Sequence, residues 1–123
     1  MGYGGTTFNI LSELRRNKTF ANIRNVMDLG AQESFLSGAD GFAENFLKAY
    51  GVENASAREI HQLVEKRFVK YLWERVGIEY FSTDVDAQFE TLLLDLNFES
   101  VPAEYRNRFD LTTNCGTTEH VVN

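Results

Sequence analysis

The chain has 123 residues and a formal net charge of −6, and hydrophobic residues make up 43% of it. These values suit one compact domain with a core, and they argue against a disordered chain and a basic nucleic-acid surface. No apolar run is long enough to cross a bilayer, and the first residues lack a signal-peptide pattern. The single cysteine, Cys115, permits no internal disulfide, and His61 and His120 lack metal-ligand spacing. We therefore expect an acidic protein of the reducing cytoplasm without a metal site.

The first predicted element is a short amphipathic helix over Thr7–Arg16, within an N-terminal helix region that covers residues 7–22. Either Thr6 or Thr7 can cap it, and its apolar residues share one face. The preceding MGYGG segment is rich in glycine. We expect this end to be either disordered or a flexible loop over a ligand.

A strand is predicted over Ile23–Leu29, and it ends at Gly30. This strand opens the part of the domain, residues 23–123, that we expect to form the core. The stretch Gln32–Tyr50 has apolar residues at roughly helical spacing, but Gly38 and Gly41 interrupt it. We therefore expect two short helices there.

The clearest predicted helix runs from Ser56 to Val76. Its first residues, SARE, form a capping box in which the Ser56 hydroxyl accepts a first-turn amide and Glu59 reaches back to the cap. One apolar stripe follows along the helix, and Gly77 is a typical C-terminal stop.

Three further strands are predicted: IEYFSTDVD from Ile78, TLLLDLN from Thr91 and RFDLTTN from Arg108, with Pro102 in a turn before the last. Strands that alternate with helical stretches are typical of an α/β domain with a parallel sheet and crossover helices. Such sheets bind ligands beyond the carboxyl ends of their strands.

Polar residues follow all four predicted strands: Asp28, Asp84 with Asp86, Asp95 with Asn97, and Asn114. A carboxylate just past a strand can bind the two hydroxyl groups of a ribose, because these groups donate hydrogen bonds. The opposing interpretation is that short acids simply end strands and cap helices, and local sequence alone favours it. The order of the motifs along the chain favours a ribose site instead.

Four motifs in order resemble those of the class I S-adenosylmethionine-dependent methyltransferases. VMDLGAQ resembles the first motif, YFSTDVD the second, LLLDLN the third, and FDLTTNCGTTEHV the fourth with the segment after it. The resemblance covers Asn25–Val122. It implies a Rossmann-like parallel sheet with flanking helices, truncated after four strands in the order 3-2-1-4, with a helical insertion between strands 1 and 2. It also implies S-adenosylmethionine as cofactor. The methyl acceptor is unidentified, and the acidic charge of the chain favours a small molecule or a protein over nucleic acid.

The resemblance assigns roles to residues at one end of this sheet. It makes Asp28 and Gly30 the contacts of the methionine end of the cofactor. Asp84 becomes the acid that binds the ribose, with Asp86 as a less certain neighbour.

The later motifs supply the other end of the expected site. Asp95 and Leu96 would flank the adenine. Asn114 would line the pocket between cofactor and acceptor, with Glu119 and His120 just after it. His120 could act as a base, although helix-start packing or capping is the commoner role for such a residue.

The chain departs from the family pattern in three respects. Gln32 and Ser34 stand where glycines are usual, so the Gln32 side chain would either crowd the cofactor or hydrogen-bond to it. The distance from Gly30 to Asp84 requires inserted helices. Only the first four strands of the family fold are expected in the sequence up to Asn123. The fourth strand would then be an exposed edge through which two copies could pair.

Two functions therefore stay open. One is the cofactor-binding part of a methyltransferase, and the other is a methyltransferase-like binding or assembly module that has lost turnover. A dinucleotide-dependent oxidoreductase is disfavoured, because Gly30-Ala31-Gln32 does not follow the GxGxxG pattern. Cys115 is interpreted as a small buried thiol rather than a nucleophile.

Overall fold

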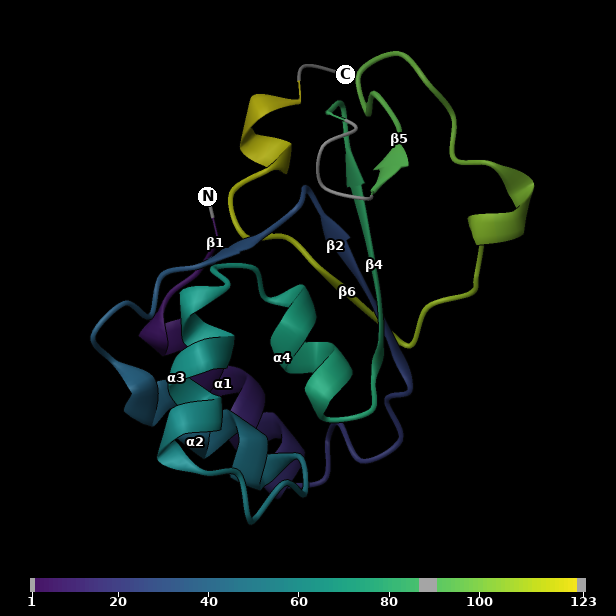
Figure 1. The fold of residues 1–123 in the computed structure, drawn as a ribbon. Helices are drawn as coiled ribbons and strands as arrows, with labels where there is room; N and C mark the ends of the chain where they lie inside the picture. The colour runs from purple at the N-terminus through teal and green to yellow at the C-terminus, as the bar shows by residue number, and fades with distance from the viewer. Residues whose placement is uncertain (1, 87–90, 122–123) are drawn as a thin grey trace.

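The computed structural model describes residues 2–86 and 91–121, and Figure 1 shows their fold. Its centre is a sheet of four parallel strands in the spatial order β5-β4-β2-β6. These strands are β2 (Asn25–Leu29), β4 (Glu79–Asp84), β5 (Leu92–Leu93) and β6 (Leu111–Thr113). The predicted α/β class, with a parallel sheet and flanking helices, is confirmed, although β5 and β6 are shorter than expected.

Strand β2 is central, with β4 paired along its whole length on one edge and β6 paired with its three middle residues on the other. Three consecutive residues of this strand are buried: Val26, Met27 and Asp28. A parallel strand that is covered on both faces has such a continuous buried run. The aspartate that ends this run therefore needs hydrogen-bond donors inside the protein.

Four helices gather on one side of the sheet in Figure 1: α1 (Gly5–Arg16), α2 (Asp40–Ala49), α3 (Ala57–Glu65) and α4 (Lys70–Arg75). Their shared core is aromatic. The Phe46 ring centroid lies 4.5 Å from that of Tyr50, 5.0 Å from that of Trp73 and 5.4 Å from that of Phe8. Val26 of β2 belongs to the same core, so the helices are packed onto the sheet through it.

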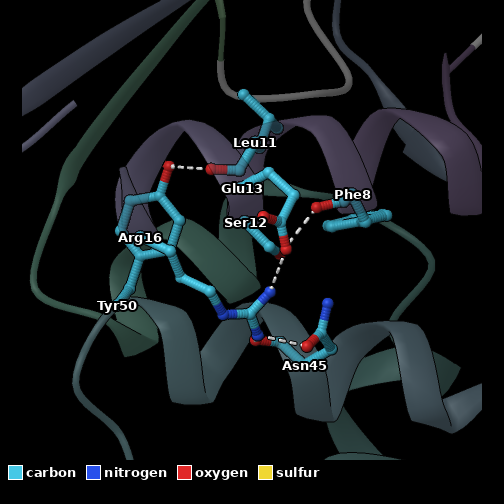
Figure 2. A network of polar contacts seen from close by, with 7 residues as sticks. All are labelled: Phe8, Leu11, Ser12, Glu13, Arg16, Asn45 and Tyr50. Carbon is cyan, nitrogen blue, oxygen red and sulfur yellow. Dashed lines mark hydrogen bonds and ion pairs between the residues drawn. The ribbon is translucent and has the colours of Figure 1, made fainter. Parts of the chain in front are cut away.

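Polar contacts join α1 to α2 beside this core, as Figure 2 shows. Arg16 on α1 forms an ion pair with Glu13 at 2.7 Å and also donates to the side chain of Asn45 on α2. The Tyr50 hydroxyl, just after α2, donates to the Leu11 carbonyl at 3.1 Å. These contacts hold α1 and α2 together beside the aromatic core.

The expected cap of the first helix is wrong. Helix α1 begins at Gly5, and Gly4 occupies the cap position without any side-chain hydrogen bond. Thr6 and Thr7 lie inside the helix instead. The helix starts earlier than predicted because the preceding residues are held in a strand.

The expected flexible N-terminal end is also wrong. Strand β1 (Gly2–Tyr3) pairs in parallel with β3 (Glu33–Ser34), and Tyr3 is 0% exposed. A Cβ atom at Gly2 would lie 2.0 Å from the Glu33 carbonyl oxygen, so only glycine permits this approach. The glycines at this end therefore allow close packing.

The stretch Gln32–Tyr50 contains one helix, α2, where two were expected. Its first part forms β3, which is held by β1. Gly38 then adopts a left-handed φ of 74°, which no helix interior accommodates. The helical spacing of the apolar residues before Gly38 was therefore misleading.

The predicted helix from Ser56 to Val76 is wrong in its length, because it is divided into α3 and α4. Arg67 lies between them with a left-handed φ of 65°. The Arg67 carbonyl accepts the Ser34 amide at 2.6 Å, and the Val69 amide donates to the Gln32 carbonyl at 3.2 Å. Pairing with the β3 segment therefore outweighs the helical preference of this sequence.

The capping box is confirmed in part. The Ser56 side chain accepts the Glu59 amide at 3.1 Å, as expected for an N-cap. The Glu59 carboxylate, however, bonds to the Arg75 guanidinium rather than reaching back to the cap.

A segment rich in aromatic residues joins β5 to β6. It contains a short 3-10 helix, η2 (Ala103–Tyr105). The Arg108 guanidinium lies 4.8 Å from the centre of the Phe81 ring and 6.0 Å from that of Phe109. None of the described helices is long and apolar enough to span a membrane.

Candidate functional site at the carboxyl ends of the strands

A cleft of about 340 Å³ lies beyond the carboxyl ends of the four parallel strands. Each strand contributes the segment that follows it or forms its end: Gly30–Gln32 after β2, Thr83–Val85 at β4, Leu94–Asn97 after β5, and Thr117, His120 and Val121 after β6. Figure 1 shows β5 and the yellow segment after β6 at the same end of the sheet. This is the end at which open α/β sheets bind their ligands.

The cleft brings together five of the eight predicted site residues: Gly30, Gln32, Asp84, Asp95 and Leu96. Among the residues that the structure describes, Asp28, Asp86 and Asn114 are not part of its lining. His120, which was considered as a base, does line it. The structure therefore brings part of the predicted site together. Asp84, Asp95 and Leu96, expected beside the ribose and the adenine, line the cleft, whereas Asp28, expected at the methionine end, does not.

Asp84 lies at the end of β4 and is held by backbone amides. Its Oδ2 accepts the Ala31 amide at 3.0 Å, and its Oδ1 accepts the Val85 amide at 2.7 Å and the Asp86 amide at 3.3 Å. The first of these bonds joins the end of β4 to the turn after β2. An ionised carboxylate has about four lone-pair directions, so Asp84 retains the capacity to accept from a ligand.

The β5 side of the cleft combines apolar surface with one acid. Leu94 is 5% exposed, and its amide donates to the Asp84 carbonyl at 3.0 Å, so that this segment lies against the end of β4. Asp95 Oδ1 accepts the Asn97 amide at 2.9 Å, which orients its carboxylate. Leu96 and Val85 add apolar surface that a flat ring could cover.

The turn after β2 is closed by side chains from inside the protein. Gly30 has a φ of 85°, and a Cβ atom there would lie 2.3 Å from the Thr117 hydroxyl oxygen. The Gln32 amide donates to the Leu29 carbonyl at 2.8 Å and to the Thr117 hydroxyl at 3.2 Å. The Thr117 hydroxyl in turn donates to the Leu29 carbonyl. Gln32 is only 1% exposed, so its amide serves the turn itself.

Asp28 is 0% exposed, and both of its carboxylate oxygens are bonded to tyrosines. The Tyr3 hydroxyl donates to Oδ1 at 2.6 Å, and the Tyr80 hydroxyl donates to Oδ2 at 2.8 Å. Burial raises the pKa of Asp28 to about 7, while the two tyrosine hydrogen bonds act to lower it. Asp28 thus links the N-terminal strand, β2 and β4 behind the cleft.

Asn114 shapes the turn after β6. Its Oδ1 accepts hydrogen bonds from the Thr117 amide at 3.1 Å and the Thr118 amide at 3.2 Å. Asparagine side chains commonly stabilise turns in this way. Cys115 is half-buried, and burial raises the pKa of its thiol. The His120 side chain is 67% exposed at the end of η3 (Thr118–His120), 3.5 Å from the Glu119 carboxylate.

Three important residues were missed by sequence reasoning: Tyr3, Tyr80 and Thr117. Tyr80 lies in β4 and packs against the helical core, although burial along this strand does not alternate from residue to residue. Tyr3 stands in a glycine-rich end, and Thr117 in an irregular turn, so neither belongs to a periodic pattern. Their partners are 25 and 85 residues away in sequence, which local spacing does not reveal.

The cleft is acidic. Its lining includes the carboxylates Asp84 and Asp95 but, among the described residues, no lysine or arginine. Phosphate groups are normally held by cationic side chains or helix N-termini, so the lining suits a neutral or cationic polar ligand better than a phosphorylated one. The described residues also include no group of three or more His, Cys, Asp or Glu placed to hold a metal ion.

Comparison of the chain with protein-family models, with curated proteins and with solved structures finds no match. The chemistry of the cleft is therefore argued from its own residues.

Proposed function

We propose that this domain binds S-adenosylmethionine in the cleft and forms the cofactor-binding part of a methyltransferase. The observation that carries the proposal is the placement of Asp84. Its carboxylate lies at the carboxyl end of β4, is held by the amide of Ala31 in the turn after β2, and lines the cleft. An acid in this position, with three backbone amides already donating to it, can accept one further hydrogen bond from a ribose hydroxyl group.

The arrangement of the strands supports the proposal. Along the chain, the motif-bearing strands are β2, β4, β5 and β6, and the sheet places them in the order β5-β4-β2-β6. We interpret this arrangement as the order third, second, first, fourth that the sequence resemblance implies, and this interpretation supports the proposal. The end of the second of these strands and the segment after the third then meet at one cleft, whose lining includes Asp84, Asp95 and the apolar residues Val85, Leu94 and Leu96.

The charge of the cleft favours this ligand over a dinucleotide. A pyrophosphate would lie beside Asp84 and Asp95 without any described lysine or arginine in the lining to balance it. The side chains of Gln32 and Thr117 also fill the turn after β2, where a dinucleotide site needs glycine backbone.

The residues present fit the nucleoside part of the cofactor. Asp84 would accept from a ribose hydroxyl, and Asp95 with Leu96 would flank the base. When bound, S-adenosylmethionine supplies a methyl group that is already activated on a sulfonium. The remaining task of the chain is to hold the cofactor and the acceptor in the orientation that transfer needs.

A binding or assembly module without turnover is the second candidate. It is favoured by the burial of Asp28, whose two oxygens are bonded within the protein. Such a module could pair with a second copy through β6, which pairs only with β2 among the described strands. Sedimentation of the chain at increasing concentration tests this: a dimer supports pairing, and a monomer throughout contradicts it.

Calorimetric titration with S-adenosylmethionine tests the proposed function. The 123-residue chain should bind it, and Asp84→Asn should weaken binding by roughly tenfold or more, since it removes a charged acceptor. Asp86→Asn is the matched control. It removes the same charge from a residue two positions after Asp84, and the side chain of Asp86 is not part of the cleft lining. Equal losses in the two variants would contradict the role given to Asp84.

A further inference from the structure

We infer that the cleft is an adenosine site whose amino-acid end is closed, so that it binds 5′-thioadenosines without selecting for the amino-acid tail. This inference rests on the proposed function and narrows it. The family resemblance implies that Asp28 and Gly30 contact the methionine end. In this structure Asp28 is bonded to Tyr3 and Tyr80, and Gly30 lies against the Thr117 hydroxyl.

The first step concerns Asp28, the acid expected at the methionine end. It is 0% exposed, with Tyr3 on one oxygen at 2.6 Å and Tyr80 on the other at 2.8 Å. The Tyr3 hydroxyl also lies 3.0 Å from the Thr113 hydroxyl on β6. The N-terminal strand therefore covers this carboxylate, and a ligand in the cleft has no direct path to it.

The second step concerns the turn after β2. The Thr117 hydroxyl and the Gln32 amide occupy the Leu29 carbonyl, and the Thr117 hydroxyl lies against Gly30 where a side chain would otherwise be. In addition, the Ala31 amide is used by Asp84. The Leu29 carbonyl and the Ala31 amide are thus already bonded within the protein, so neither is available to hold the tail of a ligand.

The third step concerns charge. The amino-acid tail of the cofactor carries a carboxylate, and a carboxylate that leaves water needs a cation or several donors. The described lining offers no lysine or arginine, and its ionised groups, Asp84 and Asp95, are acids. The nucleoside end, by contrast, meets Asp84, Asp95 and Leu96 directly.

The consequence is a distinctive order of affinities. Contact energy comes from the base and the ribose, so ligands that share the adenosine part and an uncharged 5′ sulfur should bind alike whatever extends from that sulfur. A site that gripped the tail through one charged hydrogen bond would favour the tailed ligand by roughly tenfold or more.

Calorimetry with three ligands on the 123-residue chain tests this: S-adenosylmethionine, S-adenosylhomocysteine and 5′-methylthioadenosine. S-adenosylhomocysteine and 5′-methylthioadenosine share an uncharged 5′ sulfur, and we expect their dissociation constants to lie within about threefold of each other, a difference well below one charged hydrogen bond. S-adenosylmethionine, whose sulfonium is positive, should bind at least as tightly beside Asp84 and Asp95. Asp84→Asn should weaken the two uncharged-sulfur ligands by the same factor, and Asp86→Asn should leave both unchanged.

The outcomes separate the inference from the function on which it rests. If S-adenosylhomocysteine binds at least about tenfold more tightly than 5′-methylthioadenosine, the closed end is contradicted while the cofactor site stands. Unequal effects of Asp84→Asn on S-adenosylhomocysteine and 5′-methylthioadenosine contradict it as well. If a folded chain binds none of the three, both the inference and the proposed function are overturned.

Discussion

The hydroxyl of Tyr3 donates a hydrogen bond of 2.6 Å to the buried carboxylate of Asp28, and so joins the N-terminal strand to the middle of the sheet. Tyr80 completes the arrangement from β4 with a bond of 2.8 Å. A carboxylate without such donors would be costly at this depth. The relationship therefore links a predicted ligand contact to the stability of the fold, and it has consequences that can be measured.

Stability should depend on pH through Asp28. Its pKa is about 7 in the folded chain, against the ordinary value of 3.8, because burial disfavours the charged form. Between these values the folded state binds more protons than the unfolded state, so the free energy of unfolding falls as pH rises. At about 1.4 kcal/mol for each pKa unit, the loss reaches about 4 kcal/mol by pH 7.

Urea denaturation of the wild type and of Asp28→Asn at several pH values measures this effect. The wild type should lose stability steadily from about pH 4 to pH 7, and the variant should be nearly flat over the same range. Parallel curves for the two proteins would show that another group is responsible.

Removal of the Tyr3 hydroxyl should destabilise the protein. In Tyr3→Phe, one oxygen of the buried Asp28 loses its donor, which typically costs about 1–3 kcal/mol in the free energy of unfolding. The same hydrogen bond lowers the pKa of Asp28, so the variant should also lose stability up to a higher pH than the wild type.

Tyr105→Phe is the control for this substitution. Tyr105 is only half-buried and lies in the segment between β5 and β6, where it stacks with Phe109 at 6.3 Å between ring centroids. Its hydroxyl should contribute little to the free energy of unfolding in urea. A loss in Tyr105→Phe as large as that in Tyr3→Phe would argue against a special role for the bond to Asp28.

Substitution of Gly30 should be more harmful than that of another glycine with the same kind of backbone. Gly30→Ala faces both a left-handed φ of 85° and the Thr117 hydroxyl 2.3 Å from the new Cβ atom. Gly51→Ala has a φ of 94° with no atom within 4 Å, so it reports the backbone cost alone, roughly 1–2 kcal/mol. Thermal denaturation of both variants should show the larger loss for Gly30→Ala, and equal losses would mean that the Thr117 turn moves away freely.

The sheet was predictable because each strand has a recognisable local sequence pattern. The run of apolar residues before Gly30 and the acids after β4 and β5 located the strands and their ends. The break at Arg67 was not predictable, since its left-handed backbone is stabilised by pairing with Ser34 and Gln32 across the fold. A single helix was the better local solution, and tertiary pairing outweighed it.

The candidate site shows the same division. Asp84 and Asp95 were found from their positions after strands. The closure around Asp28 was not found, because Tyr3 and Tyr80 approach it from 25 and 52 residues away. The sequence therefore predicted which acids lie at the strand ends, and only the packing showed which of them face the cleft.

The central claim is that a nucleoside binds beside Asp84, and the most direct measurement is a titration of the ¹⁵N-labelled chain with S-adenosylmethionine followed by NMR. The Ala31 amide, which donates to Asp84 at 3.0 Å, reports on that carboxylate. Our account predicts a saturable shift of the Ala31 and Leu94 amide signals, with the amides of α2 and α3 unmoved. Saturation without any change at Ala31, or no change anywhere in the spectrum, would contradict it.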